Sequence, residues 1–160
     1  MEIFEVNLYI ETTLKGPAIR EAAGMYVLEF IKQNGEPETR NEVIYCEKAK
    51  ENELVLELLI SALKRLNKPC SVLVNTECQH VLNTLNNTWL FMWEKNGWTN
   101  AKGKEVANKE LWQQYLELQD PHYVTVTNEK HSYKEIYMKE TLKKEMEREH
   151  TESVERRKDV

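Results

Sequence analysis

Three β-rich runs ahead of the first helical pattern constrain the fold of this chain more than any other feature. The run at residues 4–13 alternates polar and apolar side chains, and one of its faces is formed by Val6, Leu8 and Ile10. Two further runs within residues 24–48 are separated by Asn34-Gly35, a pair that tolerates positive φ angles and favours a reversal between strands. The first part of the chain is therefore predicted to form an antiparallel meander of three strands.

A helical pattern and a short strand follow the meander. Residues 49–67 are rich in good helix formers, and their apolar side chains recur at spacings of three or four. The apolar run at residues 70–77 has the length of a strand, and a helix between two strands favours a parallel crossover. The remaining patterns predict helices at residues 78–87, 88–96 and 107–119, a strand at 122–128 and a last helix from residue 132. The expected fold class is α/β, with a five-stranded mixed sheet of three antiparallel and then two parallel strands, flanked by helices.

The composition is that of one globular domain. The chain has 160 residues, 41% of them hydrophobic and 31% charged. It is therefore large enough to bury a core without help from disulfides or metal ions. Its three cysteines show neither a CxxC motif nor Cys/His spacing, which indicates neither a disulfide framework nor a zinc site. The domain is predicted to span residues 1–144, and the almost entirely charged residues 145–160 are expected to form a frayed helix end or a disordered tail.

Charge and hydropathy argue against two classes of protein. The formal net charge of −5 is unlike that of a polybasic nucleic-acid binder, although a local basic patch can still contact phosphates. No apolar run approaches the length of a membrane span, and acidic residues stand where a signal peptide would be basic. A cytoplasmic protein without a membrane partner is expected, with a monomer as the expected oligomeric state.

A tryptophan-rich segment with scattered lysines, residues 89–112, is the most specific motif. It follows the pattern W-x-x-x-W-x-x-x-x-W-x-x-A-x-x-x-x-V-x-N-x-x-L-W. This motif and the order of the elements resemble the bacterial type of ribonuclease H over about residues 4–144. In that family the segment forms a protruding handle that contacts the DNA strand of an RNA/DNA hybrid. The resemblance implies contacts with nucleic acid from Trp93, Lys95, Trp98, Lys102, Lys104 and Asn108, with Lys109 as a further phosphate contact.

The resemblance also implies a metal-dependent hydrolase. The chemistry of this family resembles two-metal catalysis, with two divalent ions roughly 4 Å apart, and the carboxylates come from the first strand, the first helix, the fourth strand and the last helix. Glu11 falls on the first of these positions and Glu77 on the third. Glu140 is the best candidate for the fourth, with Glu135 as its rival. Glu11, Glu77 and Glu140 are therefore predicted to bind Mg²⁺ or Mn²⁺.

The second carboxylate position departs from the family. An ungapped alignment places Val55 where the family has a glutamate. Glu51, four residues earlier on the same helix face, could supply a substitute carboxylate, or it is an ordinary first-turn glutamate favoured by the helix dipole. Glutamates in place of aspartates also displace each carboxylate, and misplacement by about an ångström can cost on the order of 10²-fold in rate. The predicted site is either reorganised or impaired.

Several further positions match those of the family. His131 corresponds to a loop histidine that is thought to assist proton transfer or product departure, a role that suits a group titrating near neutral pH. A surface histidine without a role is the alternative. Asn52 and Gln79 fall on positions that hydrogen-bond the hybrid in its minor groove, where RNA exposes its 2′-hydroxyl. Thr12 and Thr13 are expected to add contacts beside the cleavage site.

The residues support three hypotheses for the function. The first is a ribonuclease H-like endonuclease that cleaves the RNA strand of RNA/DNA hybrids, with catalytic residues drawn from Glu11, Glu51, Glu77, His131 and Glu140. The second is a catalytically impaired homologue that binds nucleic acid or a protein partner, and Val55 is its main support. The third is an ordinary α/β interaction domain whose handle binds protein, which the acidic net charge favours.

Overall fold

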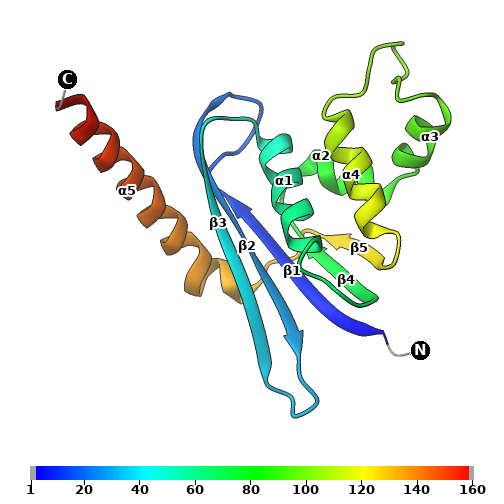
Figure 1. Ribbon diagram of the computed structural model, residues 1–160, viewed down its shortest axis with the longest axis horizontal. Coiled ribbons are helices and arrows are strands. Elements are labelled where there is room, and N and C mark those ends of the chain that lie inside the picture. The colour runs from blue at the N-terminus through cyan, green and yellow to red at the C-terminus, as the bar shows by residue number, and fades with distance from the viewer. Residues whose placement is uncertain (1–2, 159–160) are drawn as a thin grey trace.

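A five-stranded mixed sheet forms the centre of the computed structural model, which describes residues 3–158. Its strands are β1 (Phe4–Thr12), β2 (Arg20–Ile31), β3 (Pro37–Ala49), β4 (Cys70–Asn75) and β5 (Tyr123–Thr127). They lie in the order β3-β2-β1-β4-β5 (Figure 1). β1, β2 and β3 form the antiparallel meander, whereas β4 runs parallel to β1 and β5 runs parallel to β4. The predicted fold class is confirmed.

The predicted reversal between β2 and β3 lies at Asn34 and Gly35. Gly35 has a φ angle of +85°, which favours a residue without a side chain. The backbone N–H of Lys32 donates to the carbonyl of Glu36 at 2.9 Å, and the Asn34 Oδ1 accepts from the N–H of Glu36 at 3.0 Å. These contacts fix the register in which β2 pairs with β3.

Helices cover both faces of the sheet (Figure 1). One face carries α1 (Glu51–Leu63), α2 (Gln79–Asn86), α3 (Trp89–Lys95) and α4 (Lys109–Gln119), and the other carries the π-helical turn η1 (Lys134–Met138) with α5 (Lys139–Lys158). The approach of α1 to β2 is close, because a Cβ on Gly24 would lie 2.7 Å from Cδ1 of Leu58. On the opposite face, Met138 and Leu142 pack against β2.

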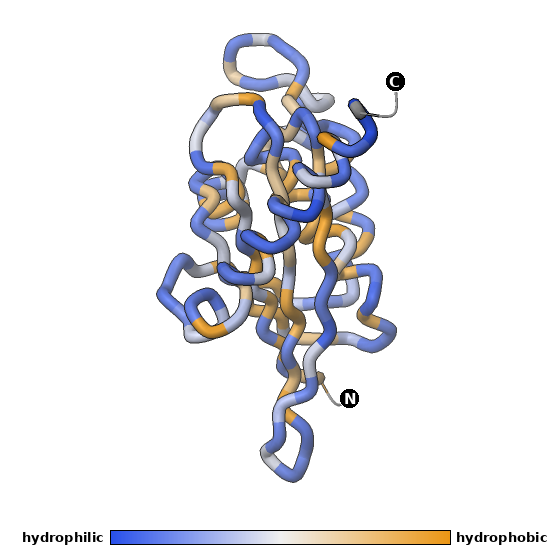
Figure 2. Tube along the Cα trace, turned by 90° about the vertical axis from the view of Figure 1, so that its left-hand side faces the viewer, coloured by the Kyte–Doolittle hydropathy of each residue, from blue (hydrophilic) through white to orange (hydrophobic). Residues whose placement is uncertain are grey.

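Hydropathy matches this layered arrangement. Figure 2 shows apolar residues gathered in the centre of the molecule, whereas the tip of the β2–β3 hairpin and the last turns of α5 are hydrophilic. Among the described residues, no helix combines the length and the apolar character that crossing a bilayer requires.

α5 continues as one helix through the predicted boundary at residue 144 to Lys158. Arg148 forms ion pairs with Glu145, Glu149 and Glu152 at 2.6, 2.9 and 3.0 Å. Pairs at helical spacings of three or four stabilise a helix by about 0.2–0.5 kcal/mol each. The charged segment is therefore helical as far as Lys158, and residues 159 and 160 of the predicted tail lie outside the described residues.

The carboxyl ends of β1, β4 and β5 lie together because these strands are parallel. Tyr9 of β1 pairs with Asn75 of β4, and Asn75 pairs with Thr127 of β5. The residues beyond these pairs therefore emerge at one edge of the sheet. In open α/β sheets, ligands bind outside the carboxyl ends of the strands, so this edge is where a site is expected.

Candidate functional site

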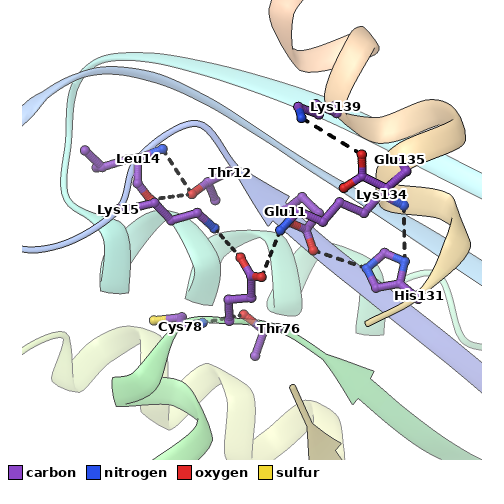
Figure 3. A network of polar contacts seen from close by, with 11 residues as sticks. Glu11, Thr12, Leu14, Lys15, Thr76, Cys78, His131, Lys134, Glu135 and Lys139 are labelled. Atoms are coloured by element: carbon purple, nitrogen blue, oxygen red, sulfur yellow. Dashed lines mark hydrogen bonds and ion pairs between the residues drawn. The ribbon is translucent and has the colours of Figure 1, made fainter. Parts of the chain in front are cut away.

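Two glutamates from neighbouring parallel strands meet at this edge. Glu11 lies near the end of β1 and is only 6% exposed, and Glu77 lies just beyond the end of β4. Nζ of Lys134 lies 2.8 Å from Oε1 of Glu77 and 3.6 Å from Oε1 of Glu11. Figure 3 shows Glu11 and Lys134 within one polar network. The structure thus brings together the two carboxylates that the sequence assigns to the first and fourth strands, with an ammonium group between them.

A second lysine approaches Glu77 from the loop after β1. Nζ of Lys15 lies 2.8 Å from Oε2 of Glu77. The hydrogen bonds from Lys134 and Lys15 lower the pKa of Glu77 to about 2, against an ordinary value of 4.5. The hydrogen bond to Glu77 in turn raises the pKa of Lys134. Glu77 and Lys134 are therefore both charged at neutral pH.

His131 connects Glu11 to the start of the last helix. Its Nδ1 accepts the backbone N–H of Lys134 at 3.3 Å, and its Nε2 lies 3.2 Å from Oε2 of Glu11. Because a nitrogen that accepts carries no proton, this contact assigns the proton to Nε2, which then donates to the carboxylate. His131 thus caps the beginning of the helix that carries Lys134 and contacts Glu11 with the same ring.

The segment that carries His131 and Lys134 is anchored on the sheet by two tyrosines. The hydroxyl of Tyr133 donates to Oε2 of Glu29, and Nδ2 of Asn7 donates to Oε1 of Glu29 at 3.0 Å. The ring of Tyr9 lies 4.4 Å from that of His131 and 5.0 Å from that of Tyr133, between centroids. The hydrogen bond to Glu29 raises the pKa of Tyr133 to about 12. Lys134 therefore extends from a segment held in place by hydrogen bonds and aromatic contacts.

A pocket opens beside the two glutamates. It is lined by Glu11, Glu77, His131, Lys134, Glu135 and Asn75, together with neighbouring polar residues. The side-chain oxygen of Asn75 is buried without a hydrogen-bond partner among the described residues. Glu135 is largely exposed, and its carboxylate lies 3.9 Å from Nζ of Lys139.

Glu135 is in this pocket, but the structure does not bring Glu140 or Glu51 there. Glu140 is exposed on α5 and does not line the pocket, whereas its rival Glu135 does. Glu51 lines a different pocket, and Val55 is 2% exposed within the main core. The predicted set of Glu11, Glu77 and Glu140 is thus not assembled, and no carboxylate from α1 joins the pair.

The side chains present do not fit the divalent ions that the resemblance implies. Mg²⁺ takes near-octahedral oxygen ligands at about 2.0–2.1 Å. Within residues 3–158, no group of three or more His, Cys, Asp or Glu side chains is arranged to hold a metal ion. At the point where Glu11 and Glu77 converge, the group between them is the ammonium of Lys134.

A second pocket gathers three of the predicted hybrid contacts. Asn52 of α1, Gln79 of α2 and Asn108, which precedes α4, line it together with Lys50 and Gly16. Oδ1 of Asn52 accepts from the Cys78 thiol at 3.3 Å, and Nε2 of Gln79 donates to Oδ1 of Asn83 at 3.1 Å. The two amide side chains therefore retain unused donors and acceptors for a ligand in this pocket.

Thr12 and Thr13 use their hydroxyls within the turn that follows β1. The Thr12 hydroxyl donates to the carbonyl of Leu14 at 2.7 Å and accepts the Leu14 N–H at 3.2 Å. The Thr13 hydroxyl accepts the N–H of Ala23 at 3.0 Å. In the structure these threonines shape the turn that leads to Lys15, a role that the sequence did not indicate.

The tryptophan-rich segment forms α3, a loop and the start of α4, and its buried side chains belong to the main core. Trp112 is fully buried, and the Trp93 ring lies 6.3 Å from the Trp112 ring and 6.5 Å from the Trp98 ring, between centroids. Trp98 is 9% exposed and has a φ angle of 64°, which is uncommon for a bulky residue. Trp98 therefore packs inside the handle, and it is not an exposed contact surface.

The loop of the handle presents its lysines outward. Oδ1 of Asn100 accepts the backbone N–H groups of Lys102 and Lys104 at 2.9 and 3.1 Å, which closes the loop tip. The side chains of Lys95, Lys102 and Lys104 are exposed. Lys109 differs from them, because its Nζ lies 3.4 Å from the carboxylate of Glu105.

The RNase H family model matches residues 8–132 of this sequence. This chain belongs to the ribonuclease H family. A ribonuclease H of Caldicellulosiruptor saccharolyticus is 38% identical over 73 residues, which cover 46% of this chain and 50% of that protein. The match thus spans about half the length of this curated relative.

Solved structures of low sequence identity share the fold. The crystal structure of LC9-RNase H1, described as a type 1 RNase H with the type 2 active-site motif, superimposes with a TM-score of 0.68 at 17% identity and covers 81% of this chain and 64% of its own. A foamy viral protease-reverse transcriptase in complex with RNA/DNA hybrid gives a TM-score of 0.59 at 14% identity, covering 78% of this chain and 17% of its own.

Two lysines of this ribonuclease H homologue were not identified as site residues from its sequence. Lys134 lies three residues after His131, a helical spacing that puts both on one face and could have indicated a shared site. Lys15 has no comparable signal, since it lies in an irregular loop whose direction depends on the folded turn.

Proposed function

We propose that this ribonuclease H homologue binds RNA/DNA hybrids and that its hydrolytic centre is impaired. One observation carries the second half of the proposal: the ammonium of Lys134 lies between the carboxylates of Glu11 and Glu77. A hydrolytic centre of the family type needs further acids at this point, and Val55 and the exposed Glu140 supply none.

Hybrid binding is supported by the exposed lysines of the handle and by the polar pocket lined by Asn52, Gln79 and Asn108. The exposed lysines of the handle suit phosphate contacts, which position a protein on a nucleic acid without reading its sequence. The pocket lined by Asn52, Gln79 and Asn108 offers amide groups of the kind that contact 2′-hydroxyls and base edges. The foamy viral protease-reverse transcriptase, which shares the fold, was solved in complex with RNA/DNA hybrid.

The balance of charges at the glutamate pair also allows a nucleic-acid phosphate to approach without repulsion. Glu11 and Glu77 carry two negative charges, and Lys15 and Lys134 supply two positive charges within ion-pair distance. A phosphodiester near this edge would therefore meet no net negative charge from the four side chains. An unpaired pair of carboxylates would repel the same phosphate.

Metal-dependent cleavage of the RNA strand is the second candidate function. It is favoured by the convergence of Glu11 and Glu77 from adjacent strands, and by Glu135, which lines the same pocket. Mg²⁺ or Mn²⁺ would be the cofactor in that case. A third carboxylate would then have to turn inward, because Glu135 is largely exposed and lies beside Lys139.

A direct test uses a labelled RNA/DNA hybrid in a binding and a cleavage assay with the same purified protein. We expect binding whose affinity falls as salt rises, because phosphate contacts release counterions, and no cleavage in Mg²⁺ or Mn²⁺. Binding of duplex DNA and of single-stranded RNA under the same conditions defines the preference for the hybrid.

The outcomes separate the hypotheses. Cleavage in wild type that disappears in Glu11→Gln and Glu77→Gln would establish the nuclease instead. Absence of hybrid binding, or an affinity that does not respond to salt, would refute the proposal and favour a protein-interaction domain.

A further inference from the structure

We propose that the ammonium of Lys134 takes the place of a divalent metal ion between the carboxylates of Glu11 and Glu77. The proposal concerns the free protein and does not depend on hybrid binding. It rests on how the carboxylate oxygens are used, on how Lys134 is held, and on which side chains surround it.

All four carboxylate oxygens of the pair already face a cationic or N–H donor. Oε1 of Glu11 faces Lys134 at 3.6 Å, and Oε2 of Glu11 faces Nε2 of His131 at 3.2 Å. Oε1 of Glu77 faces Lys134 at 2.8 Å, and Oε2 of Glu77 faces Lys15 at 2.8 Å. A metal ion that approached these oxygens would meet the positive charge of Lys134 at the point where the two carboxylates converge.

Because of its position in the helix, Lys134 is unfavourable without nearby negative charge, and the two glutamates supply that charge. A cation in the first turn of a helix faces the positive end of the helix dipole, which is unfavourable without compensation. Lys134 begins the π-helical turn three residues after His131, which accepts its backbone N–H, so it lies in the first turn of this helix. The carboxylates of Glu11 and Glu77 supply the compensation.

The backbone beneath Lys134 is fixed on both sides. On one side its N–H donates to Nδ1 of His131 at 3.3 Å, and the His131 ring packs against Tyr9. On the other side Met138, at the end of the same turn, is fully buried against β2. The backbone of Lys134 is therefore held at a place from which the side chain reaches both carboxylates.

Removal of the ammonium would also leave a carboxylate buried without its main counter-charge. Glu11 is 6% exposed, and Lys134 is the lysine that contacts it. An unpaired buried charge is strongly unfavourable. A divalent ion could replace the lost charge, but Mg²⁺ and Mn²⁺ need several oxygen ligands, and among the described residues no side chain of α1 lines the pocket beside the glutamate pair.

The exchange Lys134→Glu tests the proposal with a gain of function. This variant puts a third carboxylate at the point where Glu11 and Glu77 converge, so we expect Mn²⁺ to bind to it. Lys143→Glu is the matched control, because it makes the same charge change at an exposed position on α5. Binding is measured by isothermal titration of the free proteins with Mn²⁺ and by the shift of Tm that Mn²⁺ causes.

We expect Lys134→Glu to bind Mn²⁺ about tenfold more tightly or better than the wild type and the control, since affinity rises with the charge count of the ligands. Its Tm should rise with Mn²⁺, whereas the Tm of the other two proteins should not. Lys134→Gln serves as a second variant if the first does not fold, because it removes the charge at similar length. Mn²⁺ should then bind to Lys134→Gln more tightly than to the wild type.

Two results would overturn the proposal. The first is Mn²⁺ binding by the wild type that is lost in Glu77→Gln, because the pair would then accept the ion despite Lys134. The second is a folded Lys134→Glu or Lys134→Gln that binds Mn²⁺ no better than the wild type. Neither measurement involves nucleic acid, so a failure here is distinguishable from a failure of hybrid binding.

Discussion

Lys134 and Glu77 lie 57 residues apart in the sequence, and yet Nζ of the lysine lies 2.8 Å from Oε1 of the glutamate. The contact joins the last helix to the end of β4 at the edge of the sheet where Glu11 also lies. It gives this ribonuclease H homologue a glutamate pair that is neutralised by its own side chains.

The first prediction concerns the pH dependence of the Glu77 ion pairs. The pKa of Glu77 is about 2 in the folded protein and 4.5 in its ordinary state. Because the folded value is the lower one, the unfolded chain binds more protons between these values, and the stabilisation is complete above about pH 4.5. It is lost as the pH falls through about 2.

The measurement is the difference in Tm between the wild type and Glu77→Gln from pH 2 to pH 7. At neutral pH the variant should be less stable by at most about 1 kcal/mol, because the Glu77 side chain is 45% exposed and solvent screens the pairs. The difference should shrink toward pH 2. A difference that stays constant over this range would contradict the assignment.

The second prediction concerns the anchor beneath Lys134. Tyr133→Phe removes the hydroxyl that donates to Glu29, and a hydrogen bond to a charged group contributes about 1.5–3 kcal/mol. Urea unfolding should show a loss of this size or somewhat less. Tyr137→Phe, at an exposed position in the same turn, is the control and should change stability by less than about 0.5 kcal/mol. Equal effects of the two variants would argue against the anchor.

The third prediction concerns the handle and rests on the proposed binding of hybrids. The double variant Lys102→Glu and Lys104→Glu should weaken hybrid binding and lower the slope of log affinity against log salt by up to about 2, since each phosphate contact contributes about 0.9. Lys143→Glu with Lys144→Glu makes the same charge change on α5, on the other face of the sheet, and should leave the slope unchanged. Fluorescence anisotropy at several salt concentrations measures both.

The fold could be predicted from the sequence because its signals are local and repeated. Alternating apolar residues indicated the meander, the Asn34-Gly35 pair indicated its hairpin, and the tryptophan spacing indicated the handle through its resemblance to ribonuclease H. The meeting of Glu11 and Glu77 could be inferred because the family resemblance places β1 and β4 side by side, as the structure does. The meander and its hairpin needed only the local pattern, whereas the handle and the glutamate pair also needed the resemblance.

The partners of the glutamates could not be predicted in this way. Lysine side chains are long and flexible, so the contacts of Lys15 and Lys134 depend on a folded loop and on the start of a helix. The π-helical turn at Lys134–Met138 also adds a residue to one helical turn and rotates the rest of α5 about its axis. A regular 3.6-residue helix therefore gives no reliable orientation for Glu140 relative to Glu135.

The last prediction concerns Val55, which the resemblance drawn from the sequence aligns with a glutamate on the first helix. Val55 is 2% exposed and belongs to the main core, so Val55→Glu would bury a carboxylate among apolar side chains. A buried charge without a partner is among the few changes that destabilise a protein by more than about 4 kcal/mol. We expect a severe loss of stability in urea unfolding at pH 7, partly recovered at pH 4, where the carboxyl is more readily protonated.

Val55→Leu is the control, because it enlarges the side chain without adding a charge. It should lower the free energy of unfolding by far less than Val55→Glu. If Val55→Glu instead unfolds like the wild type, its carboxylate reaches solvent or the glutamate pair, and a single substitution would then be enough to bring a third acid toward Glu11 and Glu77.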